Sequence, residues 1–372
     1  MKKIVFILAS AQGGGAERIT INIVNNLPHN KYKTSLIFLT TEGSYRKFVR
    51  PGIDIYDLNV KLEELNPLNN MIKIAKISSL FRRLTPDIIF SNGTYCNLLS
   101  ILARFFSGNK AKLHIRETNL IVSMQKKKPL GIIKLLGFFF LYPHTDTFIA
   151  PSQAVVDDLK QAVNFNKTKT VVLPNFIDTS FIDQMAHNDT GVSLAQYPQD
   201  NLIIISVARL VIQKDYKSSL LAFKEVTRDV PCDYWILGEG PMEKRLKNLA
   251  KELGIENRVK FWGFQENPYI FMSKAKIFFS SSQFEGFPNS LLEAMYLGLP
   301  PVVTHFNASI TEVITDGQEG FIVEKGDVEK MAFALKRLLT DVPLYESMKK
   351  NTLSKIKNYS LNNAMSRLEQ IL

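Results

Sequence analysis

The sequence is poor in the residues that build metal centres and disulfide frameworks. Only two of its 372 residues are cysteines, Cys96 and Cys232, and only five are histidines. The two cysteines lie far apart and have no metal-ligand spacing, which excludes a disulfide framework and favours a reducing compartment. The scattered histidines form no ligand motif, so we expect no metal site and no bound cofactor.

Long apolar runs are also missing, and no stretch of the sequence reaches the length that a membrane-spanning helix needs. The first residues, MKKIVFILASA, are similar to a secretory signal peptide, because two lysines precede an apolar run. That run covers only residues 4–9, which is shorter than the apolar core of a signal peptide. We therefore expect a buried first strand and a cytoplasmic protein.

Acidic residues are scarce in the first half of the chain. Residues 1–180 contain 24 Lys and Arg but 12 Asp and Glu, whereas the remainder contains 22 and 23. A basic half beside a neutral half indicates that the first half meets an anionic partner. No RNA- or DNA-binding signature accompanies this charge, so we favour an anionic lipid surface or a diphosphate-linked substrate over nucleic acid.

The length and the pattern of elements predict two domains. A chain of 372 residues exceeds what one hydrophobic core holds. Both halves alternate short apolar runs with amphipathic stretches, which predicts α/β domains with doubly wound parallel sheets and crossover helices. We expect a first domain over residues 1–176, a linker without clear periodicity over residues 177–200, and a second domain over residues 201–372. The last helix is a candidate to pack back on the first domain.

Residues 280–303, SSSQFEGFPNSLLEAMYLGLPPVV, form the most informative stretch. We expect a strand over residues 277–280, a loop, and a helix in whose first turn Pro288 fits well. Gly298 then ends the helix, and a strand follows over residues 301–304. The unpaired amides of a helix start, at the carboxyl end of a parallel strand, favour an anionic or polar ligand.

Two acids lie on this stretch, Glu285 in the loop and Glu293 in the helix. Carboxylate oxygens accept hydrogen bonds from neighbouring hydroxyl groups, so two carboxylates at one site suit a polyhydroxylated ligand. The alternative for any such pair is that both acids are only solvated. The glycine–phenylalanine–proline turn and the proline-led strand around them favour a binding site.

The pattern E-G-F-P-x-x-x-x-E-A-x-x-x-G-x-P-x-V in this stretch resembles the retaining GT-B glycosyltransferases of family 4. The resemblance implies two Rossmann-like domains that face a cleft, and a nucleotide-sugar donor. It implies that Glu285 and the following amides hold the donor hexose, and that Glu293 binds the nucleotide ribose. The donor-binding residues that it indicates are Gly14, Gly15, Arg209, Lys214, Gly286, Phe287, Pro288, Asn289, Leu292 and Glu293.

Two cations, Arg209 and Lys214, follow the first strand expected in the second domain. Cations at the carboxyl end of a strand, before a helix, are well placed to neutralise a diphosphate, although surface solvation is the alternative. The resemblance implies that they hold the leaving diphosphate. We therefore take Arg209, Lys214 and Glu285 as candidate catalytic residues. The turn GEGP, residues 238–241, follows the next strand.

A glycine loop, AQGGG, follows the first strand and opens a helix. As a dinucleotide-binding fingerprint it is incomplete, because Gly13 and Gly15 fit the first two positions but Arg18 stands where the third glycine is needed. The run GGGAERI is similar to the first loop of the same family. The resemblance implies that donor phosphates or the acceptor approach the backbone at Gly14 and Gly15.

The end of the strand expected over residues 112–116 carries two further candidates. Many family members have a histidine after this strand, and Glu117 stands there in this sequence, preceded by Arg116. Either residue is placed to orient the donor or the acceptor hydroxyl, so we include both as candidate catalytic residues. His114 lies inside the strand, a position more typical of a core residue than of a catalytic one.

Residues 126–143, KKKPLGIIKLLGFFFLYP, combine lysines with an apolar block that is too short to span a bilayer. The block fits a helix in the membrane interface, with the lysines on lipid phosphates and Phe138, Phe139 and Phe140 in the acyl boundary. It fits an ordinary core helix equally well. Both interpretations stay open at this point.

The resemblance implies transfer of a hexose or N-acetylhexosamine, with retention, from a nucleotide sugar, UDP-linked by preference. The expected acceptor is a saccharide linked to a lipid diphosphate, as in polysaccharide and lipopolysaccharide biosynthesis. The protein would be peripheral on the cytoplasmic membrane face, and two cations would replace a metal ion. The alternatives are a GT-B nucleotide-sugar epimerase and an inactive subunit that binds sugar nucleotides.

Overall fold

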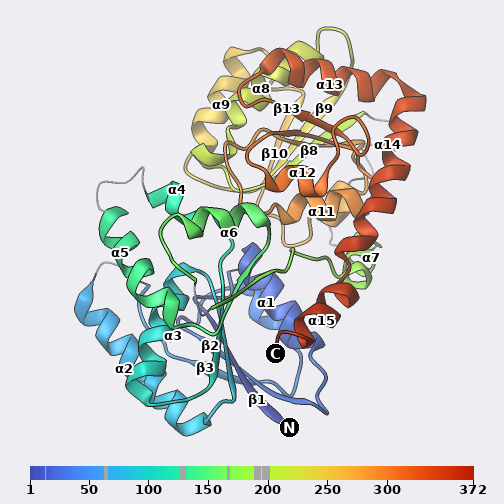
Figure 1. The fold of residues 1–372 in the computed structure, drawn as a ribbon. Coiled ribbons are helices and arrows are strands. Elements are labelled where there is room, and N and C mark those ends of the chain that lie inside the picture. The colour runs from blue at the N-terminus through green and yellow to red at the C-terminus, as the bar shows by residue number, and fades with distance from the viewer. Residues whose placement is uncertain (13, 63–65, 126–130, 166–167, 188–193, 195–201) are drawn as a thin grey trace. The chain divides into compact units, whose positions relative to one another are not determined.

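The computed structural model describes residues 1–12, 14–62, 66–125, 131–165, 168–187, 194 and 202–372 (Figure 1). The chain divides into two compact units. The first unit contains Met1–Asn175 together with Asn362–Leu372, and the second contains Phe176–Leu361. Each unit has its own parallel sheet, with hydrophobic clusters packed against it.

The first unit has a sheet whose described strands follow the order β3-β2-β1-β4-β5-β6-β7, all paired in parallel. The strands are β1 (Lys2–Leu8), β2 (Tyr32–Phe38), β3 (Asp54–Asp57), β4 (Ile88–Asn92), β5 (Lys112–Arg116), β6 (Thr147–Ala150) and β7 (Lys169–Val172). The lysine-led N-terminal run is thus a central strand, as expected, and residues 4–8 of it are buried.

Helices cover the sheet of the first unit. They are α1 (Gly15–Asn26), α2 (Pro67–Leu84), α3 (Thr94–Ser107), α4 (Ile121–Gln125), α5 (Gly131–Leu141), α6 (Gln153–Lys160) and α15 (Leu361–Glu369). The core between the sheet and α2, α3, α5 and α6 includes Phe81, Leu99 and Phe138. The C-terminal segment joins this unit through a hydrogen bond of 3.1 Å from Lys2 Nζ to the Leu372 carbonyl.

The second unit has a sheet whose described strands follow the order β10-β9-β8-β11-β12-β13, again all parallel. The strands are β8 (Ile203–Val207), β9 (Asp233–Leu237), β10 (Val259–Gly263), β11 (Ile277–Ser280), β12 (Pro301–Thr304) and β13 (Phe321–Val323). The helices are α7 (Thr179–His187), α8 (Tyr216–Val226), α9 (Glu243–Glu252), α10 (Tyr269–Met272), α11 (Asn289–Tyr296), α12 (Ser309–Val313), α13 (Val328–Thr340) and α14 (Val342–Lys355).

Two cores sandwich the second sheet because side chains alternate along each strand. Ile204 of β8 packs with the face covered by α8, α9 and α13, whereas Ile203 and Ile205 pack with α10, α11 and α12. The expected α/β architecture, two doubly wound parallel-sheet domains, is therefore confirmed.

Strand order reverses at one place in each sheet, between β1 and β4 in the first unit and between β8 and β11 in the second. At such a point the loops after two adjacent strands run in opposite directions. Their separation leaves a crevice at the carboxyl ends of the strands, where doubly wound folds bind their ligands. Loops that follow β1, β4, β8 and β11 are thus the places to look for a site.

Capping residues position the helices that leave these loops. The Asp215 carboxylate caps α8, and Ser152 Oγ caps α6 by accepting a bond from the Val155 amide. One helix bound differs from expectation. Helix α11 begins at Asn289, so Pro288 is its N-cap residue and not part of its first turn. Gly298 ends the helix with φ of +78°, as expected.

The range expected as a linker, residues 177–200, contains helix α7, which the sequence analysis did not predict. The Asp178 carboxylate accepts a bond of 3.0 Å from the Phe181 amide and so caps the helix start. Phe181, Ile182 and Met185 then pack in the hydrophobic core of the second unit. Their helical spacing was the signal, and it is only two turns long. The rest of the expected linker, except Leu194, lies outside the described residues.

The block at residues 126–143 is described only from residue 131 onward, where it forms α5 and the turn after it. Residues 126–130, with the three lysines, lie outside the described residues. Within α5, Phe138 is fully buried in the core, whereas Phe139 and Phe140 are exposed by 52% and 63%. One side of α5 therefore packs in the core, and the expectation that Phe138 meets lipid is wrong.

In the part of the chain that the structure describes, no helix combines the length and the apolar character needed to cross a membrane.

Candidate functional site

The strongest candidate residues lie on two neighbouring loops of the second unit. One loop follows β8 and carries Arg209 and Lys214, and the other follows β11 and carries Glu285. Because β8 and β11 are adjacent at the reversal of strand order, residues distant in sequence are brought together there. The adjacency of β8 and β11 thus explains how the two sequence motifs can belong to one site.

Lys214 and Glu285 form an ion pair across the two loops. Lys214 Nζ donates to Glu285 Oε1, and Ser282 Oγ donates to the same oxygen at 2.8 Å. The side chains of the pair are exposed by only 17% and 11%. A lysine and a carboxylate that are largely shielded from water interact strongly, so each fixes the position of the other.

Further hydrogen bonds connect the two loops around this pair. The Gln283 amide donates to the Gln213 carbonyl at 2.8 Å, and Gln213 Nε2 donates to the Phe284 carbonyl at 2.7 Å. Ser281 Oγ donates to the Lys214 carbonyl at 3.0 Å. The two loops are therefore one hydrogen-bonded unit, and the charged pair has a preorganised backbone beneath it.

Arg209 is exposed, and in the described residues no hydrogen bond or ion pair engages its guanidinium. Its backbone is nevertheless closely packed. A Cβ on Gly238 would lie 2.1 Å from the Ala208 carbonyl oxygen, and one on Gly240 would lie 2.4 Å from that of Leu210. Only glycines allow the turn after β9 to approach the Arg209 loop this closely. The GEGP turn therefore braces the loop, a role that the sequence did not reveal.

The segment that leads into α11 is closely packed. Gly286 and Phe287 are buried, and the Phe287 ring packs 6.1 Å from that of Tyr359. Pro288 is the N-cap residue of the helix and makes no side-chain hydrogen bond to it. Leu292, a predicted donor contact, is fully buried in the core, which leaves only its backbone for such a role.

Glu293 lies one turn into α11 and is 5% exposed. The Tyr269 hydroxyl, also buried, donates to its Oε1 at 3.3 Å. Glu285 and Glu293 thus have different partners: the first belongs to the Lys214 pair and the second to a tyrosine of α10. Both acids are held, and neither is the solvated surface acid that the alternative interpretation required.

Asn307, which follows β12, is a site residue that the sequence analysis did not identify. Its Nδ2 donates to the carbonyl of Glu285, and its Oδ1 accepts from the Ser309 amide at 2.7 Å. Asn307 therefore connects the Glu285 loop to the start of α12.

In the first unit the glycine loop follows β1, next to the reversal of strand order. Gly14 is the N-cap of α1, and Gly15 is its first residue; Gly13 lies outside the described residues. A Cβ on Gly43, with φ of +123°, would lie 1.9 Å from the Ala11 carbonyl carbon. The loop after β2 therefore braces the glycine loop, as the turn after β9 braces the Arg209 loop.

Glu117 is buried at the end of β5, with 1% exposure. It accepts hydrogen bonds from Thr94 Oγ1 at 2.9 Å, from Asn97 Nδ2 at 2.8 Å and from the Tyr142 hydroxyl. Burial in a low-dielectric environment raises the pKa of Glu117 to about 7, against the lowering effect of these donors. The structure places this candidate inside the first unit, as the link between β5, α3 and the segment after α5.

Arg116 and His114 are also buried. Arg116 donates to Asn175 Oδ1 at 2.6 Å, and burial lowers its pKa to about 10. Burial lowers the pKa of His114 to about 4, and neither ring nitrogen has a hydrogen-bond partner in the described residues. His114 is thus a core residue, as its place in the strand indicated. Catalytic roles for Arg116 and Glu117 stay predictions.

Comparisons with known proteins cover both halves of the chain. The family model described as Glycosyltransferase Family 4 matches residues 13–181, and the one described as Glycosyl transferases group 1 matches residues 195–355. The solved structure of HepE from Anabaena, in complex with UDP and glucose, covers 100% of this chain with a TM-score of 0.82 and 19% identity. This chain covers 99% of that one, so the likeness concerns the whole fold.

Two curated relatives match over most of their length. An N-acetylgalactosamine-N,N'-diacetylbacillosaminyl-diphospho-undecaprenol 4-alpha-N-acetylgalactosaminyltransferase of Campylobacter jejuni is 29% identical over 96% of this chain and 96% of its own. The lipopolysaccharide core biosynthesis glycosyltransferase LpsE of Rhizobium meliloti is 31% identical over 88% of this chain and 86% of its own. With both domains matched, and with the charged loops at the reversal of strand order, this chain belongs to the group 1, family 4 glycosyltransferases.

Proposed function

We propose that this glycosyltransferase moves a hexose or N-acetylhexosamine from a UDP-sugar to a saccharide on a lipid diphosphate, with retention of the anomeric configuration. The observation that carries the proposal is the Lys214–Glu285 pair, with Arg209 on the same loop, at the reversal of strand order. A diphosphate needs cations, and a sugar needs hydroxyl acceptors. These two loops supply both.

The charged residues have separate roles in this mechanism. When the bond between the anomeric carbon and the diphosphate breaks, negative charge builds on the leaving diphosphate. Arg209 and Lys214 offset that charge, which is electrostatic stabilisation of a leaving group by preorganised cations. Because two cations do this, the proposal needs no metal ion. The epimerase alternative uses the same cations but no acceptor.

In this mechanism, donor binding must break the ion pair between Lys214 and Glu285. In the structure Glu285 accepts from Lys214 and Ser282, so one carboxylate oxygen is already in use. The diphosphate competes for the Lys214 ammonium, and sugar hydroxyls compete for the Glu285 oxygens. Glu293 would hold the ribose while it keeps its bond from Tyr269. Donor binding therefore replaces an internal ion pair with two ligand contacts.

Support for the UDP donor and the lipid-linked acceptor comes from similar proteins. HepE was solved with UDP and glucose, and the Campylobacter relative is named for a diphospho-undecaprenol acceptor. The basic first half of this chain fits an anionic acceptor and an anionic membrane surface. We therefore place the enzyme as a peripheral protein at the cytoplasmic face of a membrane.

The first experiment is thermal stabilisation by UDP, GDP, ADP and dTDP, followed by UDP-hexoses. A nucleotide at a hundred times its dissociation constant stabilises the folded protein by about 2.7 kcal/mol. We expect UDP to raise the Tm of the wild type and to lose most of this effect with Glu293→Gln, which keeps the size of the side chain. Glu329→Gln, an exposed glutamate on α13, is the matched control.

Transfer assays then separate the alternatives. Product formed only when a lipid-linked saccharide is added supports the proposed function. Interconversion of UDP-sugars without an acceptor would support the epimerase, and nucleotide binding without any turnover would support an inactive subunit. If no nucleotide stabilises the wild type, the donor assignment is wrong.

A further inference from the structure

One face of the first unit exposes large apolar side chains. Phe105 and Phe106, at the end of α3, are exposed by 78% and 61%. Leu136, Phe139 and Phe140 of α5 are exposed by 51%, 52% and 63%. Single exposed apolar residues are ordinary, but five on two adjacent helices form a patch of the kind that meets another apolar phase. We call these five residues the α3–α5 face.

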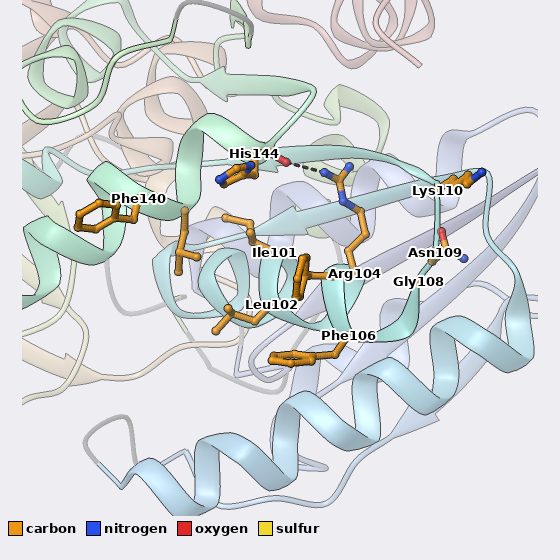
Figure 2. Close-up of a pocket in the computed structure, with 11 residues that line it drawn as sticks. Ile101, Leu102, Arg104, Phe106, Gly108, Asn109, Lys110, Phe140 and His144 are labelled. Carbon is orange, nitrogen blue, oxygen red and sulfur yellow. Dashed lines mark hydrogen bonds between the residues drawn. The ribbon is translucent and has the colours of Figure 1, made fainter.

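The face is hollowed on both sides of α5. One groove, of ≈ 670 Å³, lies between α3 and α5, and Figure 2 shows its apolar walls, with Ile101, Leu102 and Phe106 on α3 and Phe140 on α5. A second groove, of ≈ 840 Å³, lies along the other flank, where Leu136 and Phe139 line it. Helix α5 is therefore a ridge between two grooves.

The ridge is firmly attached to the unit, so its exposed side is not a product of poor packing. Phe138 and Tyr142 are fully buried, with ring centroids 5.2 Å apart. The Tyr142 hydroxyl donates to the buried Glu117, and Arg104 of α3 donates to the His144 carbonyl at 2.5 Å. These contacts fix which residues of α5 face outward.

The surroundings of the face are cationic. In the sequence, residues 101–146 contain eight Lys and Arg and two acids, of which Glu117 is buried and Asp146 pairs with Arg104. Lys110 lines the first groove and Lys160 the second, and both are exposed. Arg104 does not add to this charge, because Asp146 pairs with it at 2.6 Å. Exposed aromatics beside the exposed Lys110 and Lys160 match a phase that is apolar inside and anionic at its boundary.

We propose that the α3–α5 face docks the enzyme on an anionic lipid bilayer. Phe105, Phe106, Phe139 and Phe140 enter the boundary of the acyl chains, while Lys110 and Lys160 contact the lipid phosphates. The proposal rests on the proposed function, because it names the surface that brings the enzyme to a lipid-linked acceptor. A second copy of this chain is a poorer occupant, since two surfaces of the same charge repel.

Vesicle flotation with the full-length protein tests the proposal. The vesicles are phosphatidylcholine alone, and phosphatidylcholine with about a third phosphatidylglycerol. We expect flotation with the anionic vesicles at low salt, and a loss at high salt because the lysine contacts are screened. Phe106→Ser with Phe140→Ser should lower the partition coefficient by roughly a hundredfold, since burial of each phenylalanine is worth about tenfold or more.

The second unit offers a matched control. Phe333 of α13 is exposed by 62%, as Phe106 and Phe140 are, so Phe333→Ser removes the same apolar area elsewhere and should float as the wild type does. Absence of wild-type flotation overturns the proposal. Equal flotation of the double variant and the wild type also overturns it. So does a wild type that is a dimer in sedimentation velocity and binds no vesicles, if the double variant is a monomer.

A fluorescence measurement covers the case in which the double variant folds poorly. Phe140→Trp adds an indole to the face, while the native tryptophans, Trp235 and Trp262, lie in the second unit. Brominated anionic lipid should quench the added signal, whereas Phe333→Trp should be unaffected. Equal quenching of both variants, or of neither, contradicts the proposal. Neither measurement uses turnover, so failure of the proposed function would leave this result intact.

Discussion

The two units position the loop after their first strand in the same way, but they differ in the charged residues near that loop. In each unit, strand order reverses beside the first strand, which is β1 or β8. A glycine in the loop after the second strand, β2 or β9, packs closely against the loop that follows the first strand. Gly43 does this against Ala11, and Gly238 against Ala208. Both glycines have φ between +120° and +140°, a region closed to other residues.

The difference lies in the charged residues near these braced loops. In the second unit Arg209 is exposed, and Lys214 and Glu285 pair with each other on the loops. In the first unit Arg116 and Glu117, at the end of β5, are buried and bonded inside the unit. The shared frame therefore supplies geometry, whereas the chemistry depends on whether charges are left available for a ligand. On this ground we propose that the donor site lies in the second unit.

The largest expected effect comes from removing the exposed cation of the second unit. Arg209→Ala should lower kcat by about 10²–10³-fold and change donor affinity much less, because its charge matters most as the diphosphate leaves. Steady-state kinetics with the UDP-sugar and acceptor, together with UDP binding, measure this split. Arg228→Ala removes an exposed arginine of the same unit, which pairs with Glu225, and should be neutral.

Two other results would change the comparison. Equal losses in kcat and in donor affinity would mean that Arg209 only binds the donor. A larger kcat loss from Arg116→Lys than from Arg209→Ala would move the chemistry to the first unit. The buried environment of Arg116 makes its Ala variant a poor test, since it would leave Asn175 without its charged donor.

The second prediction tests whether the glycine brace is equivalent in the two units. Gly43→Ala and Gly238→Ala should each lower the free energy of unfolding by about 3 kcal/mol, because the new Cβ meets a backbone atom and the φ angle is strained. Gly52→Ala and Gly254→Ala are the controls. Both have positive φ but nothing within 4 Å of the added atom, so they should cost about 1 kcal/mol.

The location of the tryptophans makes the two units separately visible. Trp235 and Trp262, the only two in the chain, lie in the second unit. Gly238→Ala should therefore shift the urea midpoint seen by tryptophan fluorescence, whereas Gly43→Ala should shift mainly the transition seen by circular dichroism. Variants no less stable than their controls would show that these glycines are not braces.

Much of this fold follows from short local signals. The bounds of β11 and β12 are as predicted, because four-residue apolar runs lie between turn residues. Helix α7 was missed because its cap and two turns of apolar spacing are a weak signal beside a polar tract. Helix α6 ends at Lys160.

The sequence predicted individual site residues within one loop, but not the contacts between loops. Glu285 and Lys214 were identified singly, but 71 positions separate them, and only the order of strands brings them together. The burial of Arg116 and Glu117 depends on Asn175 and Tyr142, which lie 59 and 25 positions away. A sequence does not reveal such long-range partners. The burial of these two residues at the end of β5 was therefore not predicted.

The third prediction concerns the buried carboxyl of the first unit. The pKa of Glu117 is about 7 in the folded chain, above its ordinary value of 4.5. The folded state therefore binds more protons than the unfolded state between these values, and stability falls as pH rises through this window. Relative to Glu117→Gln, the wild type should lose on the order of 3 kcal/mol between pH 4.5 and pH 8.

Urea unfolding of both proteins across this range measures the difference. His114 titrates with the opposite sign, because burial lowers its pKa to about 4, but both proteins contain it, so its contribution cancels. Glu42→Gln changes an exposed glutamate of the same unit and should follow the wild type. A pH-independent difference would mean that Glu117 stays ionised throughout, held by its three donors.

The smallest expected effect is at Asn307, which links the Glu285 loop to α12 in the second unit. Asn307→Ala removes the donor to the Glu285 carbonyl, and we expect KM for the donor to rise about fivefold, near the 1 kcal/mol of a typical hydrogen bond. Asn307→Asp separates the two roles of the side chain. It keeps an acceptor for the Ser309 amide but has no donor for Glu285. If it behaves as Ala does, the bond to Glu285 positions the site; if it behaves as the wild type does, the helix start alone matters, and the loop around Glu285 is held by its contacts to Gln213 and Ser282.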